Sequence, residues 1–242
     1  MGQTLLQSAA GREDLKITAV LVREGSPLLG QETHGLRYSS DIPAALKGAD
    51  VLLDFSLPVG TVAALGACLQ MKKPLVTGVT GLELDLKARL QAAGKTIPVL
   101  AAPNMSLGVA LLTRMARQAA EVLGTEFDVE ISEVHHRHKK DAPSGTALAL
   151  GEAVAAGRGL PAPEGRTRGS GARQSGSIGY ASVRAGDVVG EHTVLFAGAG
   201  ERLELTHRAQ NRSTFAHGAL NAAHWIAARP AGAYSLADTL SN

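Results

Sequence analysis

Residues 51–77 of the chain read VLLDFSLPVGTVAALGACLQMKKPLVT, in which two short apolar runs flank a longer alanine-rich segment. The runs at 51–55 and 75–77 have the composition of buried strands, and residues 59–70 between them are long enough for a helix. Consecutive strands joined through a helix run parallel, because the crossover returns the chain to the same end of the sheet. The stretch therefore predicts an α/β fold.

The same alternation extends in both directions. Residues 16–22 form an apolar, β-branched run, and short helices are predicted at 2–10 and 42–47. A helix at 82–93 and a strand at 99–101 follow on the other side. This alternation predicts one parallel sheet with crossover helices.

The pattern changes near residues 104–108, where we place a domain boundary. A long amphipathic helix at 107–123 is followed by longer, alternating strands and a single helix at 144–156. The predicted strands of this half are 127–133, 178–184, 191–196 and 203–208. They indicate an α+β domain with a mostly antiparallel or mixed sheet, covering 106–215. The last helix, 214–228, is expected to return to the first domain, which then comprises 1–105 and 216–242.

Composition excludes several classes of protein. Hydrophobic residues make up 45% of the chain and charged residues 19%, which is typical of a globular protein. The net charge of +2 gives no support for binding nucleic acid, and Cys68, the single cysteine, has no partner for an internal disulfide. Neither a transmembrane run nor a signal peptide is recognisable, so we expect a cytoplasmic protein without a membrane partner. Residues 161–177, rich in Gly, Pro, Arg and Ser, are predicted to form a mobile loop or lid.

The densest chemical signal is the segment 133–146, EVHHRHKKDAPSGT. Three histidines and three cationic side chains occupy six consecutive positions, 135–140, with no carboxylate between them, which favours a bound anion. If the strand continues through these positions, its alternation places His135 and Lys139 on one face and His136 on the other. The spacing lacks a second group of zinc ligands, so no metal site is predicted. A nucleic-acid patch is disfavoured because no aromatic residues are interleaved.

The end of this segment is predicted to begin a helix. Pro143 suits the first helical turn, and Asp141 or Ser144 is expected to cap it. The N–H groups at such a start bind carboxylates or phosphates. Gly145 lets a ligand approach the backbone, and Thr146 adds a hydroxyl. The cationic segment and the helix start therefore both favour a small polyanion.

Two glycine-containing stretches and one arginine point to a dinucleotide. Residues 76–81 (VTGVTG) and 101–108 (AAPNMSLG) follow consecutive predicted parallel strands, where open α/β sheets bind ligands. Asn104 or Ser106 is expected to cap the helix after the second stretch. Arg23 follows the first predicted strand, where an arginine accommodates the 2′-phosphate of NADPH. NADPH is favoured, with NADH left open.

The pattern Glu-x-His-His-x-x-Lys-x-Asp-Ala-Pro-Ser-Gly-Thr-Ala resembles the signature of the 4-hydroxy-tetrahydrodipicolinate reductase family, also called dihydrodipicolinate reductases. Residues 51–56, 78–81, 102–109 and 186–193 resemble the same family. The resemblance implies a Rossmann-like nucleotide domain and an α+β substrate domain that assembles into a homotetramer through its sheet. It also implies reduction of a small cyclic dicarboxylate by NADPH or NADH, in the diaminopimelate route of lysine biosynthesis.

The resemblance also implies roles for individual residues. His135 and Lys139 match the catalytic pair, and His136 matches a substrate-binding histidine. Gly145 and Thr146 match the groups that hold a substrate carboxylate. The positions that match cofactor contacts are Gly2, Arg23, Gly78, Val79, Thr80, Ala102, Pro103, Asn104 and Met105. The proposed acid suits its task, since histidine has a reference pKa of about 6.5 and can supply a proton near neutrality.

One feature departs from the family pattern. Members begin with an apolar strand and a Gly-x-x-Gly-x-x-Gly loop, of which only Gly2 is present here. Two hypotheses follow: a misassigned start, or a truncated paralogue that binds dicarboxylates or oligomerises without a nucleotide. A different two-domain reductase of amino or imino acids, resembling aspartate dehydrogenase, is a further alternative that the segment 133–146 argues against.

Overall fold

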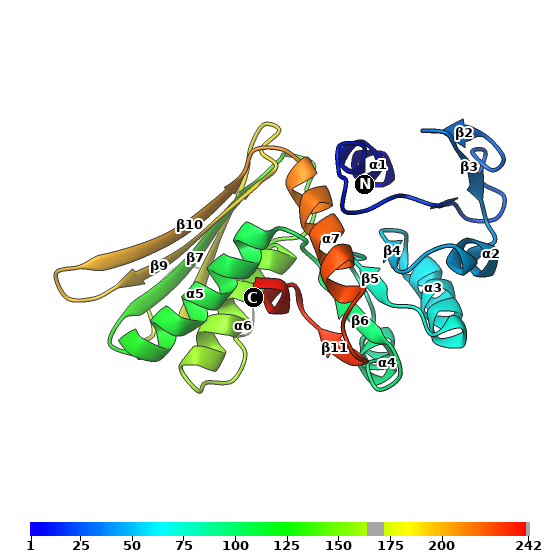
Figure 1. Cartoon of the computed structure of the whole chain (residues 1–242). Helices are drawn as coiled ribbons and strands as arrows, with labels where there is room; N and C mark the ends of the chain where they lie inside the picture. Colours follow the sequence, from blue (N-terminus) through cyan, green and yellow to red (C-terminus); the bar gives the residue numbers. More distant parts are fainter. Residues whose placement is uncertain (164–171, 241–242) are drawn as a thin grey trace. The chain divides into compact units, whose positions relative to one another are not determined.

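The computed structural model describes residues 1–163 and 172–240, so part of the loop predicted at 161–177 lies outside the described residues (Figure 1). The chain forms two compact units. Unit 1 comprises Met1–Ser106 and Ser213–Asn242, and unit 2 comprises Leu107–Arg212. Along the described residues, no helix combines the length and apolar character needed to cross a membrane.

The main sheet of unit 1 is parallel, as residues 51–77 predicted. Its strand order is β11-β6-β5-β4, and every pair in it runs parallel. The strands are β4 (Leu52–Asp54), β5 (Leu75–Thr77), β6 (Pro98–Ala101) and β11 (Gly232–Tyr234). Helices α3 (Pro58–Met71) and α4 (Leu84–Ala93) connect the first three strands, and α7 (Ser213–Ile226) packs against the same three.

The core of this sheet is aliphatic, which accounts for the scarcity of aromatic residues. Leu65, Leu75 and Ile97 are almost completely buried, and Cys68 lies among them with no exposed surface. Burial raises the pKa of the Cys68 thiol to about 12, so it stays protonated and acts as a small apolar side chain. Strand β11 was not predicted, because three residues next to Pro230 carry no periodic signal.

A second, small sheet of unit 1 corrects the prediction for residues 16–22. Only Val20 and Leu21 form a strand, β1 (Val20–Leu21), and both are half-buried. Their partner is β3 (Leu36–Ser39), which also pairs with β2 (Glu32–Thr33). With a single partner strand among the described residues, β1 has few backbone groups to pair with and stays short. Helices α1 (Gly2–Ala9) and α2 (Ile42–Lys47) form where they were predicted.

The hairpin of β2 and β3 was missed, although the sequence contains its signal. His34 and Gly35 have φ angles of 49° and 74°, respectively, and they join the two strands as a two-residue loop. Two consecutive positive φ angles are characteristic of a tight hairpin turn, in which glycine is favoured.

Unit 2 is an α+β domain with a mixed sheet, as predicted. Its strand order is β10-β9-β7-β8, with β7 and β8 parallel and the other pairs antiparallel. The strands are β7 (Asp128–His135), β8 (Ile178–Arg184), β9 (Gly190–Ala197) and β10 (Arg202–Ala209). Helices α5 (Leu107–Leu123) and α6 (Gly145–Gly157) pack on one face through a core that includes Val129, Ile131, Leu150, Val194 and Phe196.

Candidate active site

The predicted alternation of residues 135–140 is wrong, because strand β7 ends at His135. Pairing with β8 stops at His135 and Arg184, and pairing with β9 stops one residue earlier. The chain then turns, and the N–H of Lys139 donates to the carbonyl of His136 at 3.1 Å. Without a neighbouring strand to bond to, residues 136–140 form a loop at the end of the sheet.

A buried carboxylate organises the end of β7. Glu133 is 1% exposed and accepts two hydrogen bonds from the guanidinium of Arg184, each 2.8 Å long. It also interacts with Nδ1 of His135 at 2.5 Å and accepts a bond from the N–H of Ser144 at 3.2 Å. Burial alone would raise the pKa of Glu133, but the bonds from Arg184 and His135 outweigh it and lower the pKa to about 2. The carboxylate is therefore ionised throughout the neutral range.

Two buried histidines lie against each other beside this carboxylate. The rings of His135 and His192 meet edge to face, with their centroids 5.1 Å apart. Burial lowers the pKa of His135, and the neighbouring Glu133 partly offsets this. Burial also lowers the pKa of His192, to about 4, so His192 is neutral at pH 7. Nε2 of His192 interacts with Oγ of Ser144 at 3.1 Å.

Helix α6 begins beside the same network. Ser144 is its cap, accepting a hydrogen bond from the N–H of Ala147 at 3.1 Å, so Gly145 and Thr146 are the first two helical residues. Of the two caps considered, Asp141 instead binds Lys139 through two bonds of 2.8 Å. The placement of Pro143 in the first turn is wrong, since it precedes the cap. The cationic segment thus has carboxylate partners at both ends, Glu133 and Asp141.

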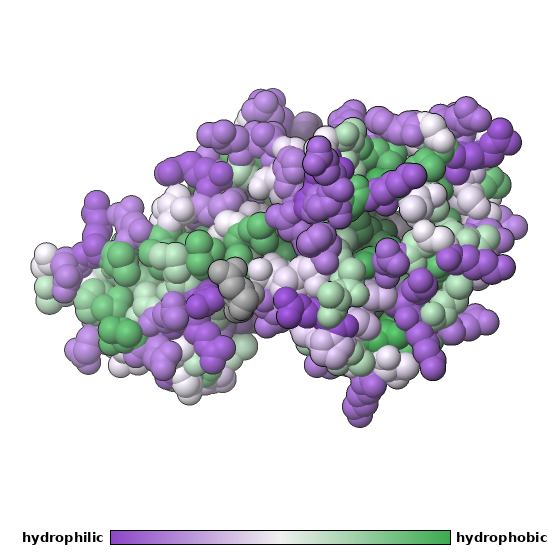
Figure 2. All heavy atoms as spheres, viewed as in Figure 1, coloured by the Kyte–Doolittle hydropathy of each residue, from purple (hydrophilic) through white to green (hydrophobic). Residues whose placement is uncertain are grey.

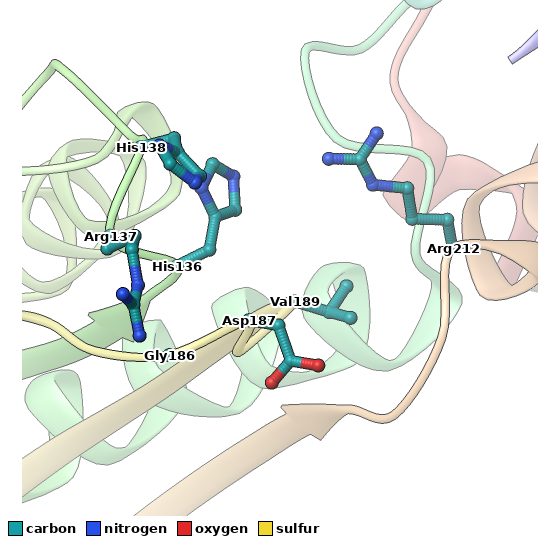
Figure 3. A pocket seen from close by; sticks show the side chains of 7 residues that line it. All are labelled: His136, Arg137, His138, Gly186, Asp187, Val189 and Arg212. Atoms are coloured by element: carbon teal, nitrogen blue, oxygen red, sulfur yellow. The ribbon is translucent and has the colours of Figure 1, made fainter.

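A hollow of about 740 Å³ lies in unit 2 next to these residues (Figure 3). The loop after β7 contributes His136, Arg137 and His138, and Figure 3 shows the side chain of Arg212 extending towards the histidines from the opposite side. The remaining lining residues, Gly186, Asp187 and Val189, belong to the β8–β9 loop. Several cationic or titratable side chains line the hollow and only Asp187 is acidic, which suits an anionic ligand.

The predicted cofactor residues gather at the carboxyl ends of two strands of unit 1. Gly78, Val79 and Thr80 follow β5, while Ala102, Pro103, Asn104 and Met105 follow β6. The two segments are neighbours because β5 and β6 pair directly, and the N–H of Ala102 donates to the carbonyl of Thr77 at 3.0 Å. A Cβ on Gly78 would collide with the ring of Phe55, so a larger residue here would require that ring to move.

Gly2 and Arg23 lie in other parts of unit 1. Gly2 opens α1, which has no side-chain cap, and a Cβ on Gly2 would meet no atom within 4 Å. An uncapped helix start in open space can accept a phosphate. Arg23 follows β1 and is exposed. These residues fit a dinucleotide, since they provide a helix start, an exposed cation and a glycine turn at the carboxyl end of β5.

Sequence reasoning assigned no role to several residues of these networks. Arg184 and His192 lie on neighbouring strands and reach the site only through the sheet register. In unit 1, the buried Asp54 accepts bonds from the hydroxyls of Ser56, Thr61 and Thr77 at 2.5, 2.6 and 3.0 Å. The described residues contain no group of three or more His, Cys, Asp or Glu side chains placed to hold a metal ion.

Solved structures share this two-unit fold. A dipicolinate-bound dihydrodipicolinate reductase from Paenisporosarcina sp. TG-14 has a TM-score of 0.75 at 24% identity, covering 97% of this chain and 92% of its own. An amine dehydrogenase from Mycobacterium smegmatis has a TM-score of 0.58 at 15% identity, covering 98% and 92%. These likenesses define the fold class of the chain, which combines a Rossmann-like unit with an α+β unit.

Sequence comparisons narrow this class to one family. Residues 1–105 match the family described as dihydrodipicolinate reductase, N-terminus, and residues 108–240 match dihydrodipicolinate reductase, C-terminus. The chain therefore belongs to the dihydrodipicolinate reductase family, which implies a nicotinamide cofactor. The 4-hydroxy-tetrahydrodipicolinate reductase of Thiobacillus denitrificans is 49% identical, and that of Pseudomonas fluorescens is 48% identical. Each alignment covers 99% of this chain and 94% of the relative.

Proposed function

We propose that this chain reduces 4-hydroxy-tetrahydrodipicolinate to tetrahydrodipicolinate, with loss of water, in the diaminopimelate route to lysine. The observation that carries the proposal is the single network joining His135, through Glu133, to the start of α6. It combines a proton donor with a site for carboxylate groups, as reduction of a cyclic dicarboxylate requires. The relatives named for this reaction align with nearly the whole chain.

His135 is the proposed proton donor. The nicotinamide, when bound, supplies a hydride, and the substrate then needs a proton from an acid of the protein. Nδ1 of His135 is occupied by Glu133, which leaves Nε2 to exchange a proton with the substrate. The lowered pKa of His135 makes the imidazolium a stronger acid than free histidine.

The remaining proposed groups hold the dicarboxylate. The helix start at Gly145 and Thr146 provides backbone N–H groups and a hydroxyl for one carboxylate. His136 lines the hollow and contacts the substrate. Lys139 neutralises a substrate carboxylate, exchanging the bonds it makes to Asp141 for bonds to the ligand.

Residues 1–105 and 216–242 form the proposed dinucleotide-binding domain. The nucleotide is held by Arg23 and by the loops after β5 and β6, with NADPH preferred over NADH because Arg23 matches its 2′-phosphate. Replacing Arg23 with Ala should raise the KM for NADPH up to about fivefold, the usual limit for an exposed ion pair, and leave that for NADH unchanged. An equal effect on both KM values would contradict this preference.

Residues 106–215 form the proposed substrate and tetramerisation domain. Strand alternation places Val134, Val183 and Leu195 on the sheet face opposite α5 and α6, and Val183 is 48% exposed. We expect four copies to associate through this face. Light scattering should give about four times the chain mass of 24.9 kDa, and Val183→Arg should reduce it. A monomeric wild type would reject the tetramer.

We also propose a cytoplasmic location, because the one cysteine is a buried thiol that needs no oxidising compartment.

The decisive test is NADPH oxidation by this chain, with substrate made in situ from pyruvate and aspartate semialdehyde by the preceding synthase. Turnover that requires the synthase would support the proposal. A folded sample that binds pyridine-2,6-dicarboxylate without turnover would contradict it, favouring a dicarboxylate-binding protein without reductase activity.

A further inference from the structure

We propose that Glu133 is a positioning residue that fixes the orientation and tautomer of His135 and, at the same time, the place of the α6 helix start. This inference deepens the proposed function and rests on it. Glu133 does not contact the substrate in this proposal. It acts through His135 and through Ser144.

The two carboxylate oxygens of Glu133 bind different partners. Oε2 lies 2.5 Å from Nδ1 of His135, and Oε1 accepts the N–H of Ser144 at 3.2 Å. Each oxygen also accepts one nitrogen of Arg184 at 2.8 Å. A bidentate guanidinium fixes the plane of a carboxylate. The bonds from Glu133 to His135 and Ser144 therefore also have a defined direction. These bonds thereby fix the distance between His135, the proposed acid, and the start of α6, where we propose that a substrate carboxylate binds.

The ionised carboxylate also selects the tautomer of His135. Glu133 can only accept, so Nδ1 carries a proton and Nε2 is the nitrogen that titrates. Nε2 lies beside Gly190, where a Cβ would approach it to 3.0 Å. The absence of a side chain at Gly190 therefore leaves room on the reactive side of the ring.

His192 forms a second link between the same two parts. Oγ of Ser144 accepts the N–H of Ala147, so its hydrogen is available for Nε2 of His192, 3.1 Å away. The ring of His192 meets that of His135 edge to face. The neutral His192 thus supports the acid without adding a charge beside it.

The charged and titratable groups that face His135 come from three strands and one loop. Glu133 precedes it on β7 and Lys139 follows in the loop, while β8 contributes Arg184 and β9 contributes His192. Helix α6 contributes only the uncharged Ser144, and His207 of β10 pairs with His192 rather than with His135. Glu133 is the one carboxylate of this set, so its removal should lower the pKa of His135.

The test compares the wild type with Glu133→Gln, Glu133→Asp and the control Glu152→Gln, which removes an exposed carboxylate from α6. Nitrogen-15 NMR of the histidine rings reports the tautomer and pKa of His135, and kcat is measured against pH. We expect the wild type to carry its proton on Nδ1. In Glu133→Gln we expect kcat to fall about 10²-fold and the alkaline limb of its profile to move to lower pH.

We also expect weaker binding of pyridine-2,6-dicarboxylate by both Glu133 variants and not by Glu152→Gln. A wild-type His135 protonated on Nε2 alone would overturn the inference, and this result needs no variant to fold. So would a folded Glu133→Gln protein whose tautomer and pH limb match the wild type, even if it were less stable. Failure of the proposed function is a different result, namely a wild type without turnover.

Discussion

Asp54 of unit 1 and Glu133 of unit 2 are both buried carboxylates near the end of a strand, but their partners differ. Asp54 receives its side-chain hydrogen bonds from the neutral hydroxyls of Ser56, Thr61 and Thr77. Glu133 receives two from Arg184 and interacts with His135, which titrates. Asp54 thus joins the loop after β4 to helix α3 and strand β5, whereas Glu133 joins a titratable imidazole to a guanidinium and to the start of α6.

The difference in partners distinguishes a site built from neutral groups, near Asp54, from a site built from ionisable groups, near Glu133. The residues near Asp54 offer backbone, glycine and hydroxyl groups, which we propose hold the nucleotide without changing their charge. The residues near Glu133 are ionisable, and their protonation sets what the site can do. Changes in unit 2 should therefore alter turnover and its pH dependence, while changes at Asp54 should alter stability.

The largest effect is expected from His135→Gln, which removes the proposed proton donor but keeps a polar side chain. Its kcat should fall by about 10²–10⁴-fold, the usual contribution of a proton-transfer group. Lys139→Ala should also mainly lower turnover, while the Kd for NADPH stays unchanged in both variants. Steady-state kinetics and nucleotide titrations check this, and near wild-type turnover in both would reject the assignments.

A smaller effect is expected in the pH dependence of stability. His192 takes up a proton near pH 4 when folded and near pH 6.5 when unfolded, so the unfolded chain binds more protons between these values. The contribution of His192 to the free energy of unfolding is therefore complete above pH 6.5 and is lost as the pH falls towards 4. It amounts to about 3 kcal/mol.

Glu133 extends the same trend to lower pH. Its pKa of about 2, against 4.5 as the ordinary value, means that its contribution to the free energy of unfolding is lost as the pH falls from 4.5 towards 2.

The contribution of His192 is tested separately by urea unfolding between pH 7 and 4.5. The free energy of unfolding should fall steeply for the wild type and less steeply for His192→Gln. Equal slopes for the two proteins would mean that His192 does not carry the effect.

The smallest effect is expected from Asp54→Asn. The amide keeps one oxygen but replaces an acceptor with a donor, so a buried hydroxyl loses its partner at a cost of about 1–3 kcal/mol. The free energy of unfolding in urea should fall by this amount, and the affinity for pyridine-2,6-dicarboxylate should not change. Weakened dicarboxylate binding would show that the two carboxylates are not independent.

Local features of both units could be predicted from the sequence. Helix α5 and strand β5 have the predicted bounds, because α5 has a periodic apolar pattern and β5 is a short apolar run between Pro74 and Gly78. The start of α6 was found within a few residues, since a cap such as Ser144 is a local signal. Alternation in the strands of unit 2 predicted a mostly antiparallel or mixed sheet, and the sheet is mixed because β7 and β8 run parallel.

The parts that could not be predicted depend on pairing between distant residues. Arg184 reaches Glu133 across 51 positions, and His192 reaches Ser144 across 48, through strand register alone. Strand β1 was predicted too long because its length depends on its partner. The exposed side of α5 could not be predicted either. It includes Leu111, Met115 and Val122, and Figure 2 shows hydrophobic surface over this helix. A helical pattern alone would assign these residues either to a core or to an interface.

The chain order of the two units bears on how the protein forms during synthesis. Unit 2 is one continuous stretch, Leu107–Arg212, whereas unit 1 needs α7 and β11 from the far end of the chain. Because domains fold as they emerge from the ribosome, unit 2 has all of its residues available before unit 1 does. Until β11 is made, the edge of β6 lacks this partner and can pair with another chain. Unit 1, whose first residues are synthesised before unit 2, is thus the last to complete its main sheet.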